Sequence, residues 1–292
     1  MNDGPIFDRR LRRLRRDRAA PHFAAADYLH RLAADDLLER LDFVRRPFSR
    51  ALDLGCGTSY LAARLRARGM EVVAADAGFA FARAGGGVQC DEDFLPFGDG
   101  AFDLIVSIGV LDSVDDLPGA LLLIRRALRP DGLFLAALAG AGALPRLKAA
   151  LLAADEVGGA ASPHIHPQID VRAAGDLLVR AGFALPVVDA HGIDVRFPDL
   201  FALVRDLRGM AATNLLIARS RKPIGRLGLA AAAAAFAAAA DPDGKTCERF
   251  EILHLLGWAP SPDQPRPARR GSATVSLTKA FSRVRTHDRQ RP

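Results

Sequence analysis

The chain has 292 residues, half of them hydrophobic and a quarter charged, which is typical of a globular protein with a large buried core. No apolar run is long enough to cross a bilayer, and the arginine-rich start lacks the apolar segment of a secretory signal. Three cysteines at unrelated spacings, Cys56, Cys90 and Cys247, indicate reduced thiols and argue against disulfides and a zinc site. We therefore expect a cytoplasmic protein.

The formal charge of +6 is concentrated at the two ends of the chain. Residues 1–18 carry seven arginines against three aspartates, and residues 261–292 carry eight basic against two acidic side chains, so the remainder is net acidic. Basic ends fit peripheral contact with an acidic membrane surface, an RNA or a partner protein, or solvated and partly disordered tails. Because the core is acidic, we expect no DNA partner, and RNA has little support.

The first 48 residues predict a basic segment followed by a cover helix. Residues 7–18 hold few apolar side chains and predict a basic, partly ordered helix. Residues 23–44 place five leucines at helical spacing, and Pro47 would end that helix. We expect the second helix to pack on a sheet or to cover a bound cofactor.

Residues 50–76 predict a strand–helix–strand unit with a glycine turn. A short apolar run ends in Gly55-Cys56-Gly57, a helical pattern follows, and a second buried run ends in Asp76. The two glycines allow a sharp turn and a close approach to a ligand, because neither carries a Cβ. Asp76, about 20 residues past the glycines, is placed to accept hydrogen bonds from two ribose hydroxyls.

Two details favour S-adenosylmethionine (SAM) over a dinucleotide as the ligand. Asp53 stands two residues before Gly55, where a carboxylate would repel a pyrophosphate but suits the cationic sulfonium and ammonium of SAM. The third glycine of the dinucleotide motif is missing, since Tyr60 fills that position. The alternative is a turn that needs glycine for geometry alone.

Strands and helices continue to alternate beyond this unit, which predicts an α/β fold with a doubly wound, mostly parallel sheet. The core at 49–140 is followed by a C-terminal half of the sheet with helical insertions at 141–260, and by a basic, partly disordered tail at 261–292. A turn is expected at 129–132, and the last strand should pair antiparallel near the sheet's edge. Strands are predicted at 51–54, 71–75, 88–90, 102–108, 133–138, 183–197 (one or two) and 250–258, and later helices at 77–84, 117–128, 144–155, 171–181, 200–207 and 224–240.

Ligands of open α/β sheets bind at the carboxyl ends of the strands. Asp91 ends the third strand and is placed to accept a hydrogen bond from the exocyclic amine of an adenine, with Phe94 shaping the pocket. The alternative for Asp91 and Asp93 is an exposed acidic loop. Asp103 is expected to cap a turn or to fix the start of its strand. The residues predicted to bind the cofactor are Asp53, Gly55, Cys56, Gly57, Asp76, Ala77, Asp91, Glu92 and Ser107.

Several motifs resemble the class I SAM-dependent methyltransferases, which implies a seven-stranded sheet with N-terminal helices and C-terminal helical elaborations. They are L-D-L-G-C-G at 52–57, D-E-D-F-L-P-F at 91–97, F-D-L-I-V-S at 102–107 and L-R-P-D-G-L-F at 128–134. The chain also resembles the family of mitochondrial complex I assembly factor 5 and its alphaproteobacterial relatives. The segments that carry this second resemblance are I-F-D-R at 6–9, S-P-H-I-H-P at 162–167, D-L-R-G-M at 206–210, G-W-A-P at 257–260 and G-S-A-T-V-S at 271–276.

The resemblance implies that Asp53, Gly55 and Gly57 contact the methionine part of SAM, Asp76 the ribose and Asp91 the adenine. That family is classed by fold as methyltransferases, although its best-studied activity is the hydroxylation of an arginine on a complex I subunit.

Two positions depart from the family pattern. Ser59 stands where relatives often have glycine, which would place a side chain close to the cofactor. Residues 111–114 read L-D-S-V where relatives read L-H-W-V, so the His and Trp that would face the cofactor are missing.

No nucleophile is needed for methyl transfer, because alignment of the acceptor with a sulfonium methyl supplies most of the acceleration. Asp112 is the candidate base, or the group that orients a cationic acceptor such as a guanidinium. His164 and His166, with Asp170 as the nearest carboxylate, could hold iron. We favour an ordered structural turn between Pro163 and Pro167 and predict no metal site.

We therefore expect an enzyme that uses SAM to modify a protein partner, with a peripheral-arm subunit of complex I as the candidate. The alternatives are a SAM-binding protein-arginine hydroxylase and a SAM-binding assembly chaperone of complex I without catalysis.

Overall fold

The computed structural model describes residues 4–264, 272 and 276. The chain divides into two units, residues 1–260 and 261–292, and every helix and strand of the described residues lies in the first. Most of the predicted tail at 261–292, with its G-S-A-T-V-S motif, is outside the described residues. Among the described residues, no helix has the length and apolar character needed to span a bilayer.

The strands of the described residues form one seven-stranded sheet in the order β3-β2-β1-β4-β5-β7-β6, which confirms the predicted fold class. Strands β1 to β5 run parallel, and β7 pairs antiparallel with β5 and with β6. The strand order reverses between β1 and β4, which is where ligands of such sheets bind. The strands are β1 Arg50–Leu54, β2 Glu71–Asp76, β3 Val88–Gln89, β4 Phe102–Ile108, β5 Leu128–Ala139, β6 Ala184–Phe197 and β7 Thr246–Trp258.

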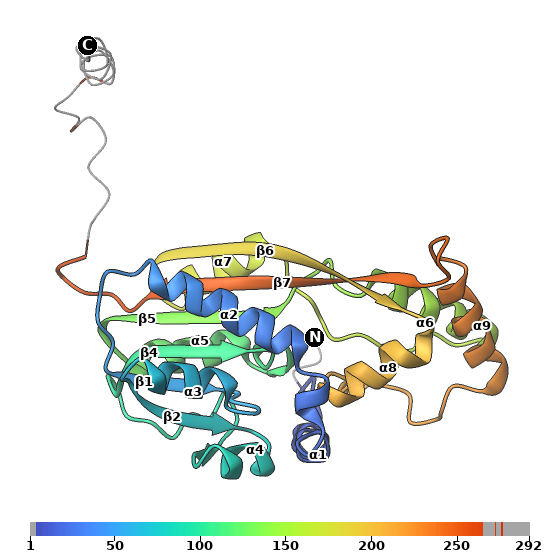
Figure 1. Ribbon diagram of the computed structural model, residues 1–292, viewed down its shortest axis with the longest axis horizontal. Coiled ribbons are helices and arrows are strands. Elements are labelled where there is room, and N and C mark those ends of the chain that lie inside the picture. The colour runs from blue at the N-terminus through green and yellow to red at the C-terminus, as the bar shows by residue number, and fades with distance from the viewer. Residues whose placement is uncertain (1–3, 265–271, 273–275, 277–292) are drawn as a thin grey trace. The chain divides into compact units, whose positions relative to one another are not determined.

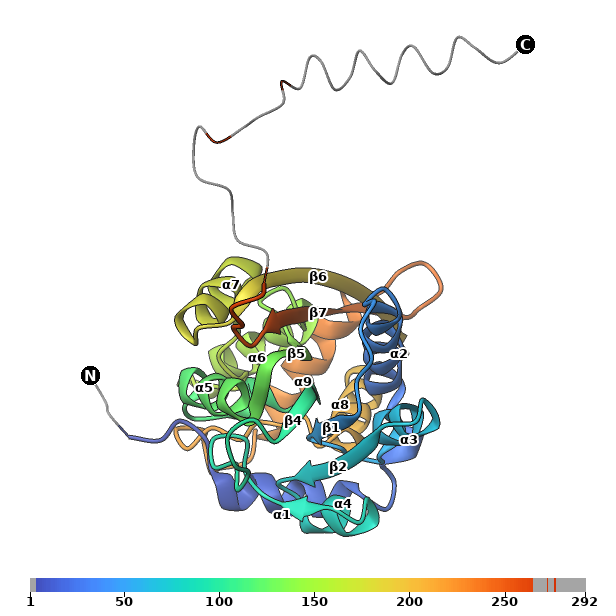
Figure 2. The same cartoon turned by 90° about the vertical axis from the view of Figure 1, so that its left-hand side faces the viewer.

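Helices cover both faces of the sheet, as Figure 2 shows: α2 and α3 lie on one face, and α5 and α7 on the other. Helices α6, α8 and α9 pack together beyond the carboxyl end of β4, around the far ends of β6 and β7 (Figure 1). The helices are α1 Arg9–Ala19, η1 Phe23–Ala25, α2 Tyr28–Asp42, α3 Tyr60–Ala67, α4 Phe79–Ala84, η2 Leu111–Ser113, α5 Leu117–Ala127, α6 Pro145–Gly158, α7 Val171–Arg180, α8 Leu200–Gly209 and α9 Arg226–Ala237.

The central strands are built from runs of apolar residues, because parallel strands are buried on both faces. In β4, every residue from Phe102 to Ser107 is buried. Asp103 holds a strand other than the one predicted: it lies in β4, but its carboxylate accepts hydrogen bonds from the backbone amides of Ser49 and Arg50 and so fixes the start of the neighbouring strand β1. Asp103 also pairs with Arg129 at 2.7 Å.

Two predicted elements differ from the structure, and the choice between one and two strands at 183–197 is decided in favour of one. The residues of the predicted turn at 129–132 form an irregular part of strand β5. The pairing with β4 shifts there from Phe102↔Leu128 to Leu104↔Leu133, and Asp131 has φ of 63°. Residues 184–197 form one strand, because β7 pairs with them along their whole length. The basic segment at 7–18 is not partly ordered: α1 is a complete helix that buries two of its arginines.

Candidate cofactor and acceptor site

The glycine turn after β1 is held against the end of β2. The backbone amides of Gly55 and Cys56 both donate to the carbonyl of Ala75, at 2.7 and 3.0 Å. Gly55 has φ of +84°, and a Cβ there would lie 2.5 Å from the side chain of Val110. Only glycine fits this conformation and this close approach to the loop after β4.

Asp76 ends β2 at the top of this turn and is completely buried. One carboxylate oxygen accepts from the amide of Gly78 at 2.7 Å and the other from the amide of Gly57 at 3.1 Å. Arg16 of α1 donates to the same two oxygens from Nε at 2.6 Å and from Nη2 at 2.5 Å. The predicted ribose acceptor is therefore engaged in a two-point ion pair with the N-terminal helix.

The acidic residues after β3 are paired with α1 in the same way. The Arg12 guanidinium donates to both oxygens of Glu92, at 2.6 and 2.9 Å, and Glu92 is fully buried. The guanidinium of Arg13 binds Asp91, which is 5% exposed. The alternative of an exposed acidic loop is therefore wrong for Asp91.

Arg9 extends this series of ion pairs towards the start of α5. Its guanidinium donates to Asp93, at 2.9 and 2.5 Å, and to Asp115 at 3.1 Å. The expectation that the N-terminal arginines are available to an external acidic surface is therefore wrong for the four on this face of α1. Within the described residues, Arg10 and Arg18 are the exposed arginines of α1 without a hydrogen bond or ion pair.

Asp53 lies beneath the turn, where it is 3% exposed and accepts a hydrogen bond from the amide of Ala62 at 3.1 Å. Burial raises the pKa of Asp53 to about 7, and the nearby Asp76 carboxylate adds to that rise. The structure thus gives Asp53 a structural partner in the first turn of α3. Its predicted contact with the methionine part of SAM stays a prediction.

The remaining predicted cofactor residues line the same edge of the sheet. Cys56 and Ala77 are buried in the turns after β1 and β2, and burial raises the pKa of the Cys56 thiol. Ser107, near the end of β4, is completely buried, and its hydroxyl has no hydrogen-bond partner among the described residues. A buried polar atom without a partner is unusual and is consistent with a place for a ligand.

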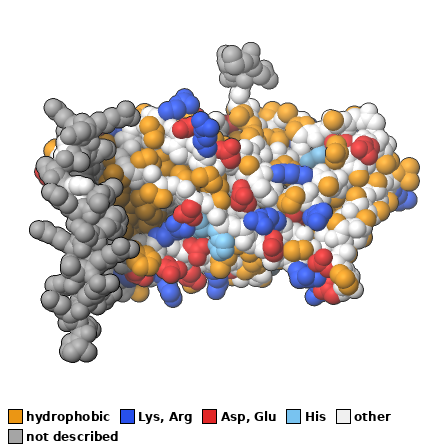
Figure 3. Space-filling view, turned by 90° about the horizontal axis from the view of Figure 1, so that it is seen from above, with side chains coloured by type: hydrophobic (Ala, Val, Ile, Leu, Met, Phe, Trp, Pro, Cys, Tyr) orange, Lys and Arg blue, Asp and Glu red, His pale blue; other side chains and the backbone are white. Residues whose placement is uncertain are grey.

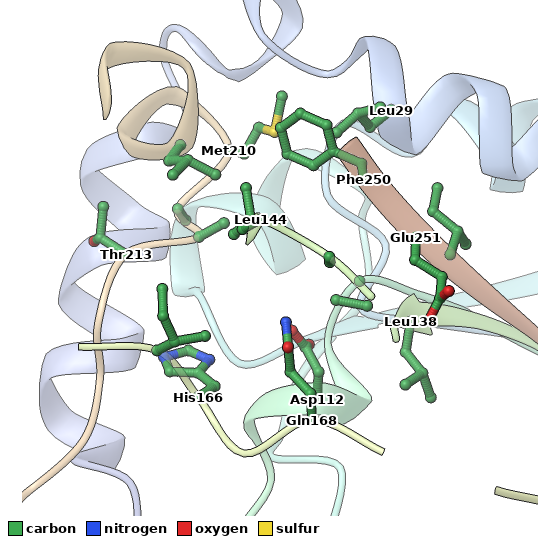
Figure 4. A pocket seen from close by; sticks show the side chains of 18 of the residues that line it. Leu29, Asp112, Leu138, Leu144, His166, Gln168, Met210, Thr213, Phe250 and Glu251 are labelled. Atoms are coloured by element: carbon green, nitrogen blue, oxygen red, sulfur yellow. The ribbon is translucent and has the colours of Figure 1, made fainter. Parts of the chain in front are cut away.

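A cavity of about 320 Å³ opens from this edge towards α6 and α8. Figure 4 shows apolar side chains, among them Leu29, Met210 and Phe250, on one side and Asp112, His166 and Gln168 on the other. Arg16 also borders the cavity, so the cavity and the carboxylate of Asp76 share one wall.

Asp112 is the carboxylate of the polar end, on the short η2 turn that follows β4. Within the described residues it makes no hydrogen bond or salt bridge. His166 is not available as a base, because its Nε2 accepts a hydrogen bond from the amide of Leu215 at 3.0 Å and burial lowers its pKa.

The two histidines of the S-P-H-I-H-P segment have different partners. His164 Nε2 lies 2.9 Å from Asp155, and Asp170 caps α7 by accepting from the amide of Ala173. Among the described residues, no three His, Cys, Asp or Glu side chains cluster as metal ligands would. The ordered-turn interpretation of this segment agrees with these contacts.

His30 is a residue of this site that the sequence did not single out. It lies on α2, borders the cavity, and its Nδ1 is buried without a hydrogen-bond partner among the described residues. Burial, together with the charge of Arg16, lowers the pKa of His30 to about 4, so the imidazole is neutral at physiological pH. No motif could have identified it, because its neighbours come from β4 and from α1.

A family model described as a methyltransferase domain matches residues 22–186, which include the glycine turn, Asp76 and Asp112. The chain belongs to the class I SAM-dependent methyltransferases. SAM is accordingly its cofactor, and the two glycines, Asp76 and the buried hydroxyl of Ser107, which has no hydrogen-bond partner among the described residues, fit that assignment. In this methyltransferase the predicted ribose acceptor, Asp76, is paired with Arg16 of α1.

Two groups of relatives cover most of this methyltransferase. The zebrafish (Danio rerio) protein named arginine-hydroxylase NDUFAF5, mitochondrial, is 36% identical over 289 residues, covering 93% of this chain and 88% of the relative. The malonyl-[acyl-carrier protein] O-methyltransferase of Laribacter hongkongensis is 32% identical over 274 residues, covering 87% and 89%. The resemblance to the assembly-factor family is thus confirmed.

A solved structure with the same fold is a putative methyltransferase of Bacillus halodurans. It is 14% identical, with a TM-score of 0.55, and the match covers 78% of this chain and all of that one. At this identity the likeness shows the fold alone.

Proposed function

We propose that this protein transfers a methyl group from SAM to a cationic side chain of a protein partner. The observation that carries the proposal is the carboxylate of Asp112, which has no hydrogen-bond or salt-bridge partner among the described residues and stands at the polar end of a largely apolar cavity. Arginine and lysine have apolar stems and charged heads. The stem would pack against the apolar lining of the cavity, and the charged head would reach the polar end.

The chemistry requires little from the chain beyond orientation. Bound SAM supplies an electrophilic methyl on a positively charged sulfur, which departs as a neutral thioether. Asp112 would hold the acceptor nitrogen towards that methyl and take up its proton, before the bond to carbon forms for a lysine ammonium and as it forms for an arginine guanidinium. The neutral imidazole of His30 borders the same cavity and adds no positive charge beside a cationic acceptor.

A carboxylate acceptor, as in the malonyl relatives, fits this cavity less well. It would lie beside the carboxylate of Asp112, and His164 of the same lining is already paired with Asp155 at 2.9 Å. The net acidic polar end therefore favours a cation over an anion. The face seen in Figure 3 carries acidic and basic side chains interspersed, so this face offers no broad basic surface for a nucleic acid.

Hydroxylation of an arginine is the second candidate, because relatives at 36–39% identity are named arginine-hydroxylases. The same carboxylate would orient the guanidinium in either reaction. A SAM-binding assembly chaperone of complex I is the third reading of the same pocket. We keep a peripheral-arm subunit of complex I as the partner and a cytoplasmic location as parts of the proposal.

Mass spectrometry of the peripheral-arm subunits, from cells with and without this protein, tests the proposal. We expect an arginine or lysine that gains the mass of one CH₂ group only when the protein is present. A gain of the mass of one oxygen atom would show that the reaction is hydroxylation and not methylation. No mass difference would contradict catalysis and favour the assembly chaperone.

The residue test is Asp112→Asn, with Asp176→Asn on the exposed face of α7 as the control for the loss of one charge. We expect Asp112→Asn to reduce modification about tenfold or more while SAM affinity is unchanged. Full modification by Asp112→Asn would contradict the role given to this carboxylate.

A further inference from the structure

Four arginines on one face of α1 hold the acidic edge of the cofactor site. Residues 9, 12, 13 and 16 are spaced so that their side chains share one side of the helix. Their carboxylate partners, Asp93, Glu92, Asp91 and Asp76, include the residues predicted to bind the ribose and the adenine of SAM. The N-terminal helix therefore occupies the polar groups that a nucleoside would use.

We propose that α1 is a built-in competitor of the nucleoside part of SAM, and that Arg16 must leave Asp76 before the ribose can bind. The inference rests on SAM as the cofactor and is independent of the acceptor that receives the methyl group. It makes Arg16 a residue that sets the affinity of the cofactor site.

The first argument is a count of hydrogen bonds on Asp76. An ionised carboxylate offers about four lone-pair positions. Two are taken by the amides of Gly57 and Gly78, and two by the guanidinium of Arg16. The amides belong to the turns that shape the site, so the guanidinium is the group that the two ribose hydroxyls can replace.

The second argument is the position of α1 on the turn after β2. A Cβ on Gly78 would lie 2.8 Å from the Cβ of Arg16, so the helix rests directly on this turn. Asp17, the next residue, accepts a hydrogen bond from the amide of Ala80 at 2.9 Å, and the Arg16 guanidinium lies 5.0 Å from the centre of the Phe81 ring. The helix and the nucleoside would thus claim the same surface.

The third argument concerns what happens to Arg16 once it is displaced. Arg16 is 6% exposed, and a buried charge that loses its partner is strongly destabilising. The guanidinium must then reach water or another anion, and Arg12 and Arg13 are linked to it through the same helix. We therefore expect SAM binding to loosen α1 and to uncover its arginine peptide bonds.

The first experiment compares the affinity of S-adenosylhomocysteine for Arg16→Gln and for Arg10→Gln by calorimetry. Both variants remove one positive charge from α1, but Arg10 faces solvent. We expect Arg16→Gln to bind about tenfold more tightly than the parent and Arg10→Gln to bind equally. Unchanged or weaker binding by Arg16→Gln would overturn the proposal.

The second experiment uses the unaltered chain and so does not depend on whether a variant folds. Trypsin cleaves after arginine, and α1 offers several such sites that docking protects. We expect cleavage within residues 9–18 to become several times faster with saturating S-adenosylhomocysteine or 5′-methylthioadenosine, and to be unaffected by free methionine.

Slower or unchanged cleavage with the nucleoside ligands would mean that α1 closes over the cofactor and does not compete with it, which would overturn the proposal. Neither experiment contains an acceptor, so a failure of the proposed methyl transfer would leave both results unchanged. A failure of the competition would, in turn, leave the search for a modified side chain open.

Discussion

The imidazole of His30 lies directly on Gly109: a Cβ at Gly109 would stand only 2.8 Å from the Nε2 atom of His30. Gly109 follows β4, has φ of +64°, and donates its amide to the carbonyl of Ala137 at 2.8 Å. This contact joins α2 to the carboxyl edge of the sheet, between the cofactor turn and the cavity. It is possible only because residue 109 has no side chain.

The first prediction concerns this contact. Gly109→Ala should lower the free energy of unfolding by about 2–4 kcal/mol, since it adds overpacking against His30 to the strain of a positive φ. Gly69→Ala is the matched control, because Gly69 has φ of +86° and open space around it, and should cost about 1 kcal/mol. Denaturant unfolding measures both.

A double variant checks the cause. If the clash with the imidazole is responsible, His30→Ala should recover part of the loss in the Gly109→Ala background. If the changes in the free energy of unfolding of Gly109→Ala and His30→Ala simply add in the double variant, the clash is not the cause of the loss.

The second prediction concerns the pH dependence of stability. Burial lowers the pKa of His30 to about 4 in the folded chain, below its ordinary value of 6.5. The unfolded chain therefore binds a proton first as the pH falls. The free energy of unfolding should therefore decrease by about 1–3 kcal/mol as the pH falls from about 6.5 to about 4.

The measurement is urea unfolding of the parent and of His30→Gln between neutral pH and pH 4. His254 and His166 also have lowered pKa values, so the difference between the two proteins isolates His30. The same substitution at the exposed His22 should leave the pH profile of the parent unchanged. A His30→Gln profile as steep as the parent's would refute the assignment.

The third prediction concerns Asp53. Burial raises its pKa to about 7, so the unfolded chain loses this proton first, and stability falls as the pH rises from about 4 to about 7. Asp53→Asn keeps an oxygen for the amide of Ala62 without a buried charge. It should raise the free energy of unfolding at pH 8 by about 1–3 kcal/mol.

Ligand binding by the same variant tests the predicted cofactor contact. If Asp53 faces the cationic methionine part of SAM, Asp53→Asn should weaken SAM severalfold and leave 5′-methylthioadenosine unchanged, because the latter has no ammonium. Calorimetry with the two ligands measures this. Equal affinity of the parent and of Asp53→Asn for SAM would show that Asp53 does not contact the cofactor and that its role is the hydrogen bond with α3.

The fourth prediction concerns Ser59, which has φ of 59° at the start of α3. This is the left-handed region that glycine adopts without cost. Ser59→Gly should therefore stabilise the protein by about 0.5–1 kcal/mol and, by removing a side chain next to the cofactor turn, tighten SAM binding severalfold. Leu185→Gly relieves a similar strain in β6, at φ of 50°, and should leave SAM affinity unaltered.

Much of the fold could be predicted because its signals are local. The glycine turn, the apolar strand runs and the helix caps each depend on residues a few positions apart. The irregularity in β5 was missed, since residues 129–132 have strong turn chemistry and only pairing with β4 keeps them in a strand.

The candidate site divides in the same way. Asp76, Asp91 and Ser107 could be placed because parallel strands end at one edge of a sheet. The role of α1 could not be predicted, because a run of arginines shows that the segment is basic but does not show which carboxylates it will bind. Arg16 and Asp76 are 60 positions apart, and Arg12 and Glu92 are 80 apart.

The sequence by itself therefore determined a SAM-type turn on a doubly wound sheet, since glycine conformation and strand-end chemistry are properties of short segments. Only the tertiary structure decided that the arginines of α1 form ion pairs with the carboxylates at the cofactor edge of the sheet, and that the imidazole of His30 packs on Gly109. Both contacts join distant segments, and the burial of the charges and of the imidazole that makes them strong exists only once the helices have packed on the sheet.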